Sequence, residues 1–177
     1  MFGKVLICLL FLTMGEFFTL YDFTKESSIT DWKVVDDTVM GGVSSGKIQL
    51  NDAGNAIFYG HVSLENNGGF SSVRHQMERL EITQYHEFEI RLKGDGKVYQ
   101  FRSRSEPSQR HSYIFKIQTT GDWQTVLIPF SAMYPAFRGN TLTITNFSGN
   151  TLAEVAFFIG NKEEQDFKLE IDYIRLK

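Results

Sequence analysis

Apolar and polar residues alternate with a period of two along most of this chain, which is the pattern of half-buried β-strands. In residues 56–64 the even-numbered positions, four of them apolar and one a glycine, fall on one face of such a strand. Phe88, Ile90 and Leu92 alternate with charged residues in the same way. Comparable runs predict further strands over residues 97–104, 111–118, 123–128, 154–159 and 167–176.

Helical periodicity is scarce, and single helical turns are expected at residues 77–80 and 131–133. The short sequence Gly94-Asp95-Gly96 joins two alternating runs and predicts a hairpin turn. A parallel sheet is not expected, because it needs crossover helices that the sequence does not contain. Many short strands with Gly-rich turns predict an all-β fold, either an antiparallel β-sandwich or a barrel.

The last alternating run changes parity near its end. The apolar residues of 167–171 share one face, whereas Ile174 and Leu176 fall on the other. A β-bulge near Asp172 or Tyr173 would bring both groups to the same face. A strand buried on both faces at its end is the alternative.

Composition and charge narrow the possible functions. The chain has 177 residues, 42% of them hydrophobic, which fits one domain with one packed core. Its net charge of −3 gives no basic field for nucleic acid. The single cysteine, Cys8, lies in the apolar N-terminal stretch, so the rest of the chain offers no disulfide, zinc-thiolate site or cysteine nucleophile.

The N-terminus resembles a secretory signal peptide, with one lysine, a short apolar run from Val5 to Leu12 and small residues after it. We expect cleavage after Gly15, export to the periplasm or the exterior, and a mature domain over residues 16–177. Glu16 interrupts the apolar run well short of the roughly 20 residues that a membrane span needs, so no transmembrane span is expected in the mature chain. A buried first strand in an intracellular protein is the alternative.

Five blocks in the same order resemble the complex I intermediate-associated protein 30 family: "DWKVVDDTVMGGVSSG" (31–46), "GHVSLENNGGFSSVR" (60–74), "LKGDGKVYQFRSR" (92–104), "WQTVLIPFSAMYPAFRG" (123–139) and "FFIGNKEEQDFKLEIDYI" (157–174). The resemblance implies a galactose-binding-like β-sandwich of the jelly-roll type. It also implies a non-enzymatic assembly factor that acts through protein–protein contacts, because the founding members help to assemble mitochondrial respiratory complex I. Export would keep this chain away from such an assembly intermediate. An exported carbohydrate-binding module is therefore the alternative function.

The stretch Asp36–Gly46 has two interpretations. Gly41 and Gly42 allow positive φ angles and close approach of a ligand or another backbone. Asp36 and Asp37 could offer their carboxylates to a cation or to sugar hydroxyls. Alternatively one carboxylate binds turn amides while Met40 fills the core, which is the interpretation we favour for Met40.

The stretch 65–74 combines a tight turn over residues 66–69 with Phe70 and Val73, which are expected to face the core. Arg74 could clamp an anion or carboxylate. The favoured alternative is an internal salt bridge to Asp36 or Asp37, which would join the two stretches into one corner. The residues assigned to structure are Trp32, Met40, Gly41, Gly42, Asn67, Gly68, Gly69, Phe70 and Asp172.

A polar sheet face is expected over residues 97–104, where Gln100, Arg102 and Arg104 alternate with Tyr99 and Phe101. In a jelly roll this face could line the concave surface that binds ligands, and a solvated face is the alternative. The loop 134–139 could add aromatic stacking. The candidate binding residues are therefore Asp36, Asp37, Arg74, Tyr99, Gln100, Arg102, Tyr134 and Arg138.

Catalytic and metal-binding patterns are not evident. The four histidines do not pair at metal-ligand spacing, and no serine lies in a nucleophile elbow. A glycosidase needs two positioned carboxylates, and nothing in the sequence marks such a pair. We therefore expect no enzymatic activity, no metal and no cofactor, and a protein or a saccharide as the binding partner.

Overall fold

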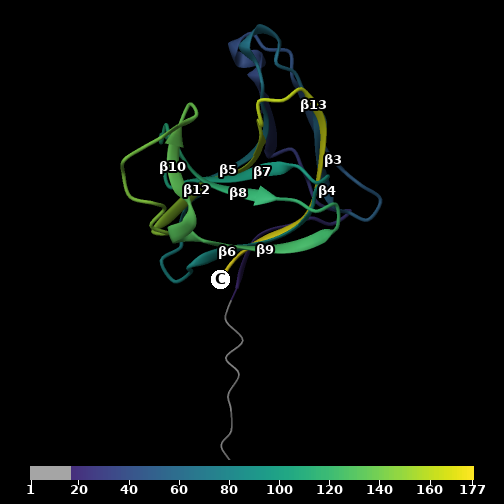
Figure 1. Cartoon of the computed structure of the whole chain (residues 1–177). Coiled ribbons are helices and arrows are strands. Elements are labelled where there is room, and N and C mark those ends of the chain that lie inside the picture. The colour runs from purple at the N-terminus through teal and green to yellow at the C-terminus, as the bar shows by residue number, and fades with distance from the viewer. Residues whose placement is uncertain (1–16) are drawn as a thin grey trace, which may run out of the picture.

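The computed structural model describes residues 17–177 and folds them into two antiparallel β-sheets packed face to face (Figure 1). Helix in this part of the chain is limited to three 3-10 turns: η1 (Asp37–Met40), η2 (Glu65–Asn67) and η3 (Phe130–Ala132). The predicted all-β antiparallel sandwich is confirmed. The signal peptide predicted for residues 1–15 lies outside the described residues and stays a prediction, as does Glu16 as the domain start.

The six-stranded sheet has the order β3-β4-β13-β6-β9, with β1 paired to β13. Its strands are β1 (Phe18–Asp22), β3 (Ser45–Leu50), β4 (Ala56–Val62), β6 (Glu87–Lys93), β9 (Trp123–Pro129) and β13 (Gln165–Leu176).

The seven-stranded sheet has the order β11-β10-β8-β7-β12-β5-β2. Its strands are β2 (Trp32–Asp36), β5 (Ser71–Glu81), β7 (Val98–Arg104), β8 (Ser112–Gln118), β10 (Tyr134–Phe137), β11 (Asn140–Thr141) and β12 (Thr151–Ile159).

The core lies between the sheets and is rich in phenylalanine. Phe88 of β6 meets Phe101 of β7 edge to face, with ring centroids 4.9 Å apart, and Phe101 contacts Phe157 of the neighbouring strand β12 at 5.4 Å. All three side chains are fully buried. Aromatic rings from both sheets therefore interlock in the core, and the opposite face of the seven-stranded sheet is left free for other contacts.

The predicted β-bulge at Asp172 is confirmed. The pairing of β13 with β6 shifts register between Ile171 and Tyr173, and Asp172 Oδ2 forms a salt bridge with Arg91 Nε at 3.0 Å. The shift turns Ile174 inward, so it is fully buried like Ile171.

The predicted hairpin at Gly94-Asp95-Gly96 is wrong, because this turn carries the chain from β6 in one sheet to β7 in the other. The Asp95 carboxylate explains the crossing, since it accepts hydrogen bonds from the Tyr99 hydroxyl at 3.1 Å and from the Lys168 backbone N–H at 3.0 Å. These two residues lie in β7 and β13, so the turn is tied to both sheets.

The two expected helical turns have different outcomes. The turn at 131–133 corresponds to η3, one residue earlier, whereas residues 77–80 lie inside the long strand β5. Between residues 17 and 177, no helix has the length and apolar character to span a membrane.

Candidate functional site

Asp37 organises a corner between two distant stretches of the chain. It is fully buried, and its carboxylate accepts hydrogen bonds from the Ser44 backbone N–H at 3.0 Å, the Ser44 hydroxyl at 2.5 Å, the Gly69 N–H at 2.6 Å and the Phe70 N–H at 3.2 Å. Asp36 adds bonds from the Gly46 N–H and the Ser71 hydroxyl. The expected packing of 36–46 against 65–74 is therefore confirmed, although the link is not the one expected.

The hydrogen bonds also decide the ionisation of Asp37. Burial opposes its charged form, but the donors from Ser44, Gly69 and Phe70 outweigh that cost and hold the pKa of Asp37 below its usual value. A carboxylate saturated by neutral donors inside the fold has no free oxygen for a ligand. Asp37 is therefore a structural residue here, and not the ligand-binding one that the sequence also allowed.

The glycines of this corner make room for the Asp37 carboxylate. A Cβ on Gly42 would lie 2.3 Å from Asp37 Oδ1, and a Cβ on Gly68 would lie 2.6 Å from Oδ2. Left-handed backbone at Gly41 (φ 92°) and Asn67 (φ 59°) turns the chain on either side. Of the residues assigned to structure from the sequence, Gly42, Gly68 and Gly69 thus lie directly against one buried acid.

Three expectations about this corner are wrong. Met40 does not fill the core but is 65% exposed, because η1 turns it away from the sandwich. Phe70 leaves the core as well and stacks on Phe158, with ring centroids 5.4 Å apart. Arg74 forms no salt bridge with Asp36 or Asp37, whose oxygens are already occupied, and its Nε donates instead to the Ser72 hydroxyl at 3.2 Å.

Trp32 and Tyr99, two further residues marked in the sequence, belong to the interior. Trp32 in β2 is buried and stacks on His75 at 5.2 Å. Tyr99 is fully buried, so its candidate binding role is wrong, and burial raises the pKa of its hydroxyl. Both side chains have the parity of the core face of the seven-stranded sheet.

A row of side chains crosses the outer face of the seven-stranded sheet. Arg74 of β5 lies opposite Ala156 of β12, which lies opposite Arg102 of β7. Ile114 of β8 and Tyr134 of β10 continue the row. Because residues directly opposite one another on paired strands point to the same face, Arg74 and Arg102 stand on either side of the small Ala156.

Three adjoining hollows form a groove on this outer face. The arginine hollow, about 420 Å³, is lined by Arg74, Arg102, Arg104, Arg110 and Arg138 together with Met40, Phe70, Ser112, Ala136, Phe137, Gly139 and Phe158. The middle hollow, about 350 Å³, shares Arg102 and Arg138 with it and adds Gln100, Lys116, Tyr134 and Lys162. The glutamine hollow, about 560 Å³, continues past Gln100 to Gln118, Asn161 and Gln165.

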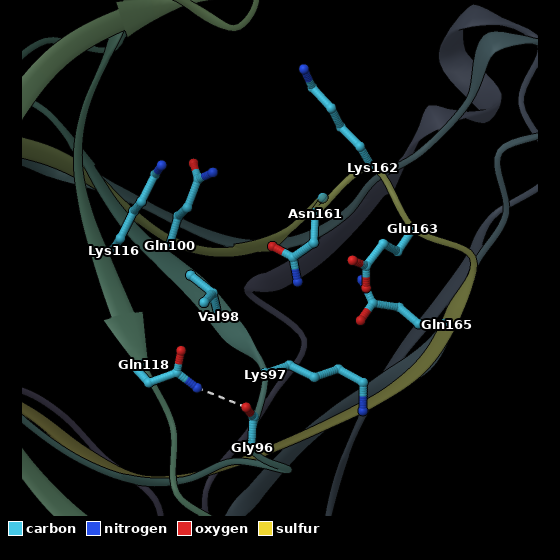
Figure 2. A pocket seen from close by; sticks show the side chains of 11 residues that line it. Gly96, Lys97, Val98, Gln100, Lys116, Gln118, Asn161, Lys162, Glu163 and Gln165 are labelled. Carbon is cyan, nitrogen blue, oxygen red and sulfur yellow. Dashed lines mark hydrogen bonds between the residues drawn. The ribbon is translucent and has the colours of Figure 1, made fainter.

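The strands and side chains around the groove can be followed in the figures. In Figure 1, β10 rises on one side of β7 and β8, and the turn that leads into β13 rises on the other. Figure 2 shows the glutamine hollow, with Gln100 and Lys116 on one side and Asn161 and Lys162 on the other. Gln118 Nε2 donates to the Gly96 carbonyl at 2.7 Å, which fixes this amide at the end of the groove.

Arg102 is held in place by an aromatic ring and an amide. Its guanidinium carbon lies 3.5 Å from the centroid of the Phe158 ring, and its Nε and Nη2 donate to Gln100 Oε1 at 3.0 and 2.7 Å. Burial, with a further contribution from the charge of Arg74, lowers the pKa of Arg102 to about 10. The guanidinium therefore stays charged at neutral pH, but no salt bridge to an acid of residues 17–177 balances its charge.

The nearest acid, Glu154, is largely committed to other partners. It is 3% exposed, and its carboxylate contacts Arg104 Nε at 3.5 Å and accepts a hydrogen bond from Gln76 Nε2 at 3.1 Å. At the other wall, the guanidinium carbons of Arg110 and Arg138 lie 5.0 and 5.5 Å from the ring centroid of Phe137. Positive charge therefore dominates the arginine hollow.

Of the eight candidate binding residues, the structure brings Arg74, Gln100, Arg102, Tyr134 and Arg138 to the groove and leaves Asp36, Asp37 and Tyr99 outside it. Sequence reasoning missed Phe158 and Lys116 as groove residues, although their parity in β12 and β8 could have identified them. Phe137 lies in the stretch 134–139 that was expected to add aromatic stacking, and the fold brings it beside Arg110 of the loop before β8, whose guanidinium carbon lies 5.0 Å from its ring centroid. In the described part of the chain, no three His, Cys, Asp or Glu side chains gather as a metal site.

Comparison with known proteins gives a family and a fold. The family model described as complex I intermediate-associated protein 30 (CIA30) matches residues 21–171. A family 11 carbohydrate-binding module of a Clostridium thermocellum cellulase has a TM-score of 0.65 at 16% identity, covering 91% of this chain and 94% of that one. A family 11 carbohydrate-binding module from Clostridium thermocellum in complex with a β-1,3-1,4-mixed-linked tetrasaccharide has a TM-score of 0.63 at 16% identity, covering 90% of this chain and 94% of that one.

Two other solved structures share the fold. A family 29 carbohydrate-binding module has a TM-score of 0.53 at 7% identity, covering 92% of this chain and 91% of that one. An agarase has a TM-score of 0.61 at 11% identity, and the match covers 91% of this chain but 24% of the agarase. No curated protein matches the sequence.

Proposed function

The chain belongs to the complex I intermediate-associated protein 30 family, and from this premise we propose that it is a non-enzymatic binding module that holds an oligosaccharide in the groove of its seven-stranded sheet. The observation that carries the proposal is the continuous groove, which runs through three hollows on one sheet face. Several of its side chains are amides, which both donate and accept hydrogen bonds as sugar hydroxyls do.

The groove follows β7 from Arg104 through Arg102 and Gln100 to Val98. This stretch of strand spans roughly 20 Å, enough for several sugar rings in a row. The similarity in fold to carbohydrate-binding modules supports the proposal of saccharide binding. At 16% identity or less, this similarity concerns the fold alone.

A binding role without catalysis is supported by the state of the acids near the groove. Hydrolysis of a glycosidic bond uses two carboxyl groups that flank the bond. Glu154 is buried and bound by Gln76 and Arg104, and Glu163 is exposed at the far end in the glutamine hollow. This arrangement favours holding a saccharide over cleaving it.

Titration of isotope-labelled protein with oligosaccharides, followed by NMR, tests the proposal. We expect shift changes at Gln100, Lys116 and Phe158, and no release of reducing ends during the titration. Gln100→Ala should weaken binding, whereas Gln49→Ala on the six-stranded sheet should not. Shift changes confined to the six-stranded sheet, or none with any saccharide, would contradict the proposal.

Contact with a partner protein is a second candidate function, favoured by exposed apolar side chains at the Asp37 corner. Val39, Met40, Val43 and Leu64 are between 43% and 70% exposed; the first three belong to the stretch 36–46, and Leu64 directly precedes the stretch 65–74 that Asp37 joins to it. Such a group is typical of a surface that binds another protein through apolar contacts. A photo-crosslinker at Val39 should then give a defined product in the native host that is absent when the crosslinker replaces exposed Leu127.

A further inference from the structure

The arginine hollow contains more positive charge than the fold itself uses. Five arginines line it, and no aspartate or glutamate of the described chain does. Arg74 and Arg102 have no salt-bridge partner among residues 17–177. The charge of Glu154 acts on both arginines, but this acid forms its direct salt bridge with Arg104. Partly buried cations without a direct ion-pair partner are costly, and they therefore point to a ligand rather than to stability.

The arginines are also held in fixed positions before any ligand arrives. Arg102 lies on the Phe158 ring and is bound by Gln100, while Arg74 is bound by Ser72. A guanidinium has five N–H donors in a rigid fork, and these contacts occupy only some of them. The remaining donors suit the planar or tetrahedral oxygens of a carboxylate or sulfate group.

The aromatic rings of the hollow support charge recognition rather than stacking on a neutral sugar. Phe158 is already in contact with both Arg102 and Phe70, and Phe137 carries Arg110 and Arg138. A sugar that stacks on an aromatic ring needs a free face. These rings instead orient guanidinium groups through cation–π contacts.

An extended peptide is a poorer fit than a saccharide. β7, β8 and β12 are each paired with a strand on both sides, so their backbones offer no free edge to which a peptide strand could add. The far end of the groove is lined by Gln100, Gln118, Asn161 and Gln165 rather than by apolar pockets for side chains.

We propose that the arginine hollow binds the carboxylate or sulfate group of an acidic oligosaccharide, whose following units lie along β7 toward the glutamine hollow. This proposal rests on the proposed saccharide-binding function and specifies its ligand class. Arg74 and Arg102, on either side of Ala156, hold the anionic group. Arg104, Arg110 and Arg138 add to the attraction from the walls of the hollow.

Calorimetric titration of the full chain with four probes tests the proposal: oligogalacturonate, a sulfated galactan tetrasaccharide, neutral cellotetraose and oligoglutamate. We expect an acidic saccharide to bind best, with an affinity that falls as salt is added. The two acidic probes distinguish carboxylate from sulfate recognition. Arg102→Gln and Arg74→Gln should each weaken binding by about ten-fold to one-hundred-fold, as expected for a lost charged hydrogen bond.

Arg91→Gln is the matched control, because it removes the same charge from the six-stranded sheet, where Arg91 pairs with Asp172. It should leave the affinity unchanged. Thermal unfolding checks that each variant folds. If Arg102→Gln does not fold, Arg102→Lys keeps the charge without the fork and should still lose affinity, and Arg74→Gln removes only one observed hydrogen bond.

The outcomes separate this inference from the proposed function. Equal binding of cellotetraose and the acidic saccharides, with no effect of the arginine variants, would overturn the inference and leave saccharide binding standing. Binding of oligoglutamate alone would overturn both in favour of an acidic partner protein. Failure of all four probes to bind would overturn the inference, whereas the proposed function is decided by the NMR titration with a wider set of saccharides.

Discussion

Asp37 and Arg102 are both charged and largely buried, but their surroundings differ. Asp37 is matched by backbone and hydroxyl donors, so the fold itself stabilises its charge. Arg102 contacts an aromatic ring and an amide oxygen but forms no direct salt bridge within residues 17–177, because Glu154 pairs with Arg104. The first arrangement stabilises the fold, and the second is the one on which the proposed anion-binding role of the arginine hollow rests.

Replacing Asp37 with asparagine should destabilise the protein in a pH-dependent way. At pH 7 we expect a loss of about 2–4 kcal/mol in the free energy of unfolding, because an amide cannot accept all the bonds that converge on the carboxylate. The folded-state pKa of Asp37 is lowered, so its contribution is fully present above the unfolded value of about 4 and is lost as the pH falls toward the lower folded value.

Urea unfolding of both proteins at pH 7 and pH 3 measures this difference. The difference in the free energy of unfolding between wild type and Asp37→Asn should be smaller at pH 3 than at pH 7. Asp122→Asn, at an exposed position, should change stability little at either pH. A gap that stays constant with pH would show that the charge of Asp37 does not stabilise the corner.

At the level of strands, the close approach of β3 and β4 requires a glycine, which has no side chain, in β4. Gly60 in β4 lies opposite Gly46 in β3, and a Cβ on Gly60 would lie 1.9 Å from the Ser45 carbonyl oxygen. Any side chain at this position must push the two strands apart. Glycine is therefore required there by contact with another backbone.

Gly60→Ala should lower the free energy of unfolding by more than about 2 kcal/mol, because a packed strand pair cannot absorb the extra atom. Gly96→Ala is the comparison, since its φ of 85° is unfavourable for alanine but nothing lies within 4 Å of the new Cβ. Its cost should be about 1 kcal/mol. If chemical denaturation shows that Gly60→Ala and Gly96→Ala lower the free energy of unfolding equally, the steric argument is contradicted.

Strand positions and faces could be predicted from the sequence, but connections between sheets could not. Parity identified the polar face of β7 and the bulge at Asp172, because side-chain direction follows from local backbone geometry. The turn Gly94-Asp95-Gly96 has the composition of a hairpin, and long-range bonds from Asp95 and Gly96 hold it between the two sheets. Such contacts leave no trace in a local pattern.

For the molecule as a whole, the net charge does not describe the charge distribution. The chain carries a net charge of −3, yet one hollow on its surface is lined by five arginines. These come from β5, β7, the loop before β8 and the segment after β10, which the fold brings together. Gln100 and Arg102 could be predicted to share one exposed face because they lie in one strand, whereas the complete arginine hollow depends on how the strands are connected.

The placement of β12 and β13 has a consequence for how the domain forms. β12 separates β7 from β5 in one sheet, and β13 separates β4 from β6 in the other. During synthesis the strands that precede β12 and β13 emerge first. Neither sheet can be complete until residues 151–176 have emerged, because these residues contain the strands that join its two parts. Both sheets would then be completed almost together, when β12 and β13 insert between strands that were synthesised earlier.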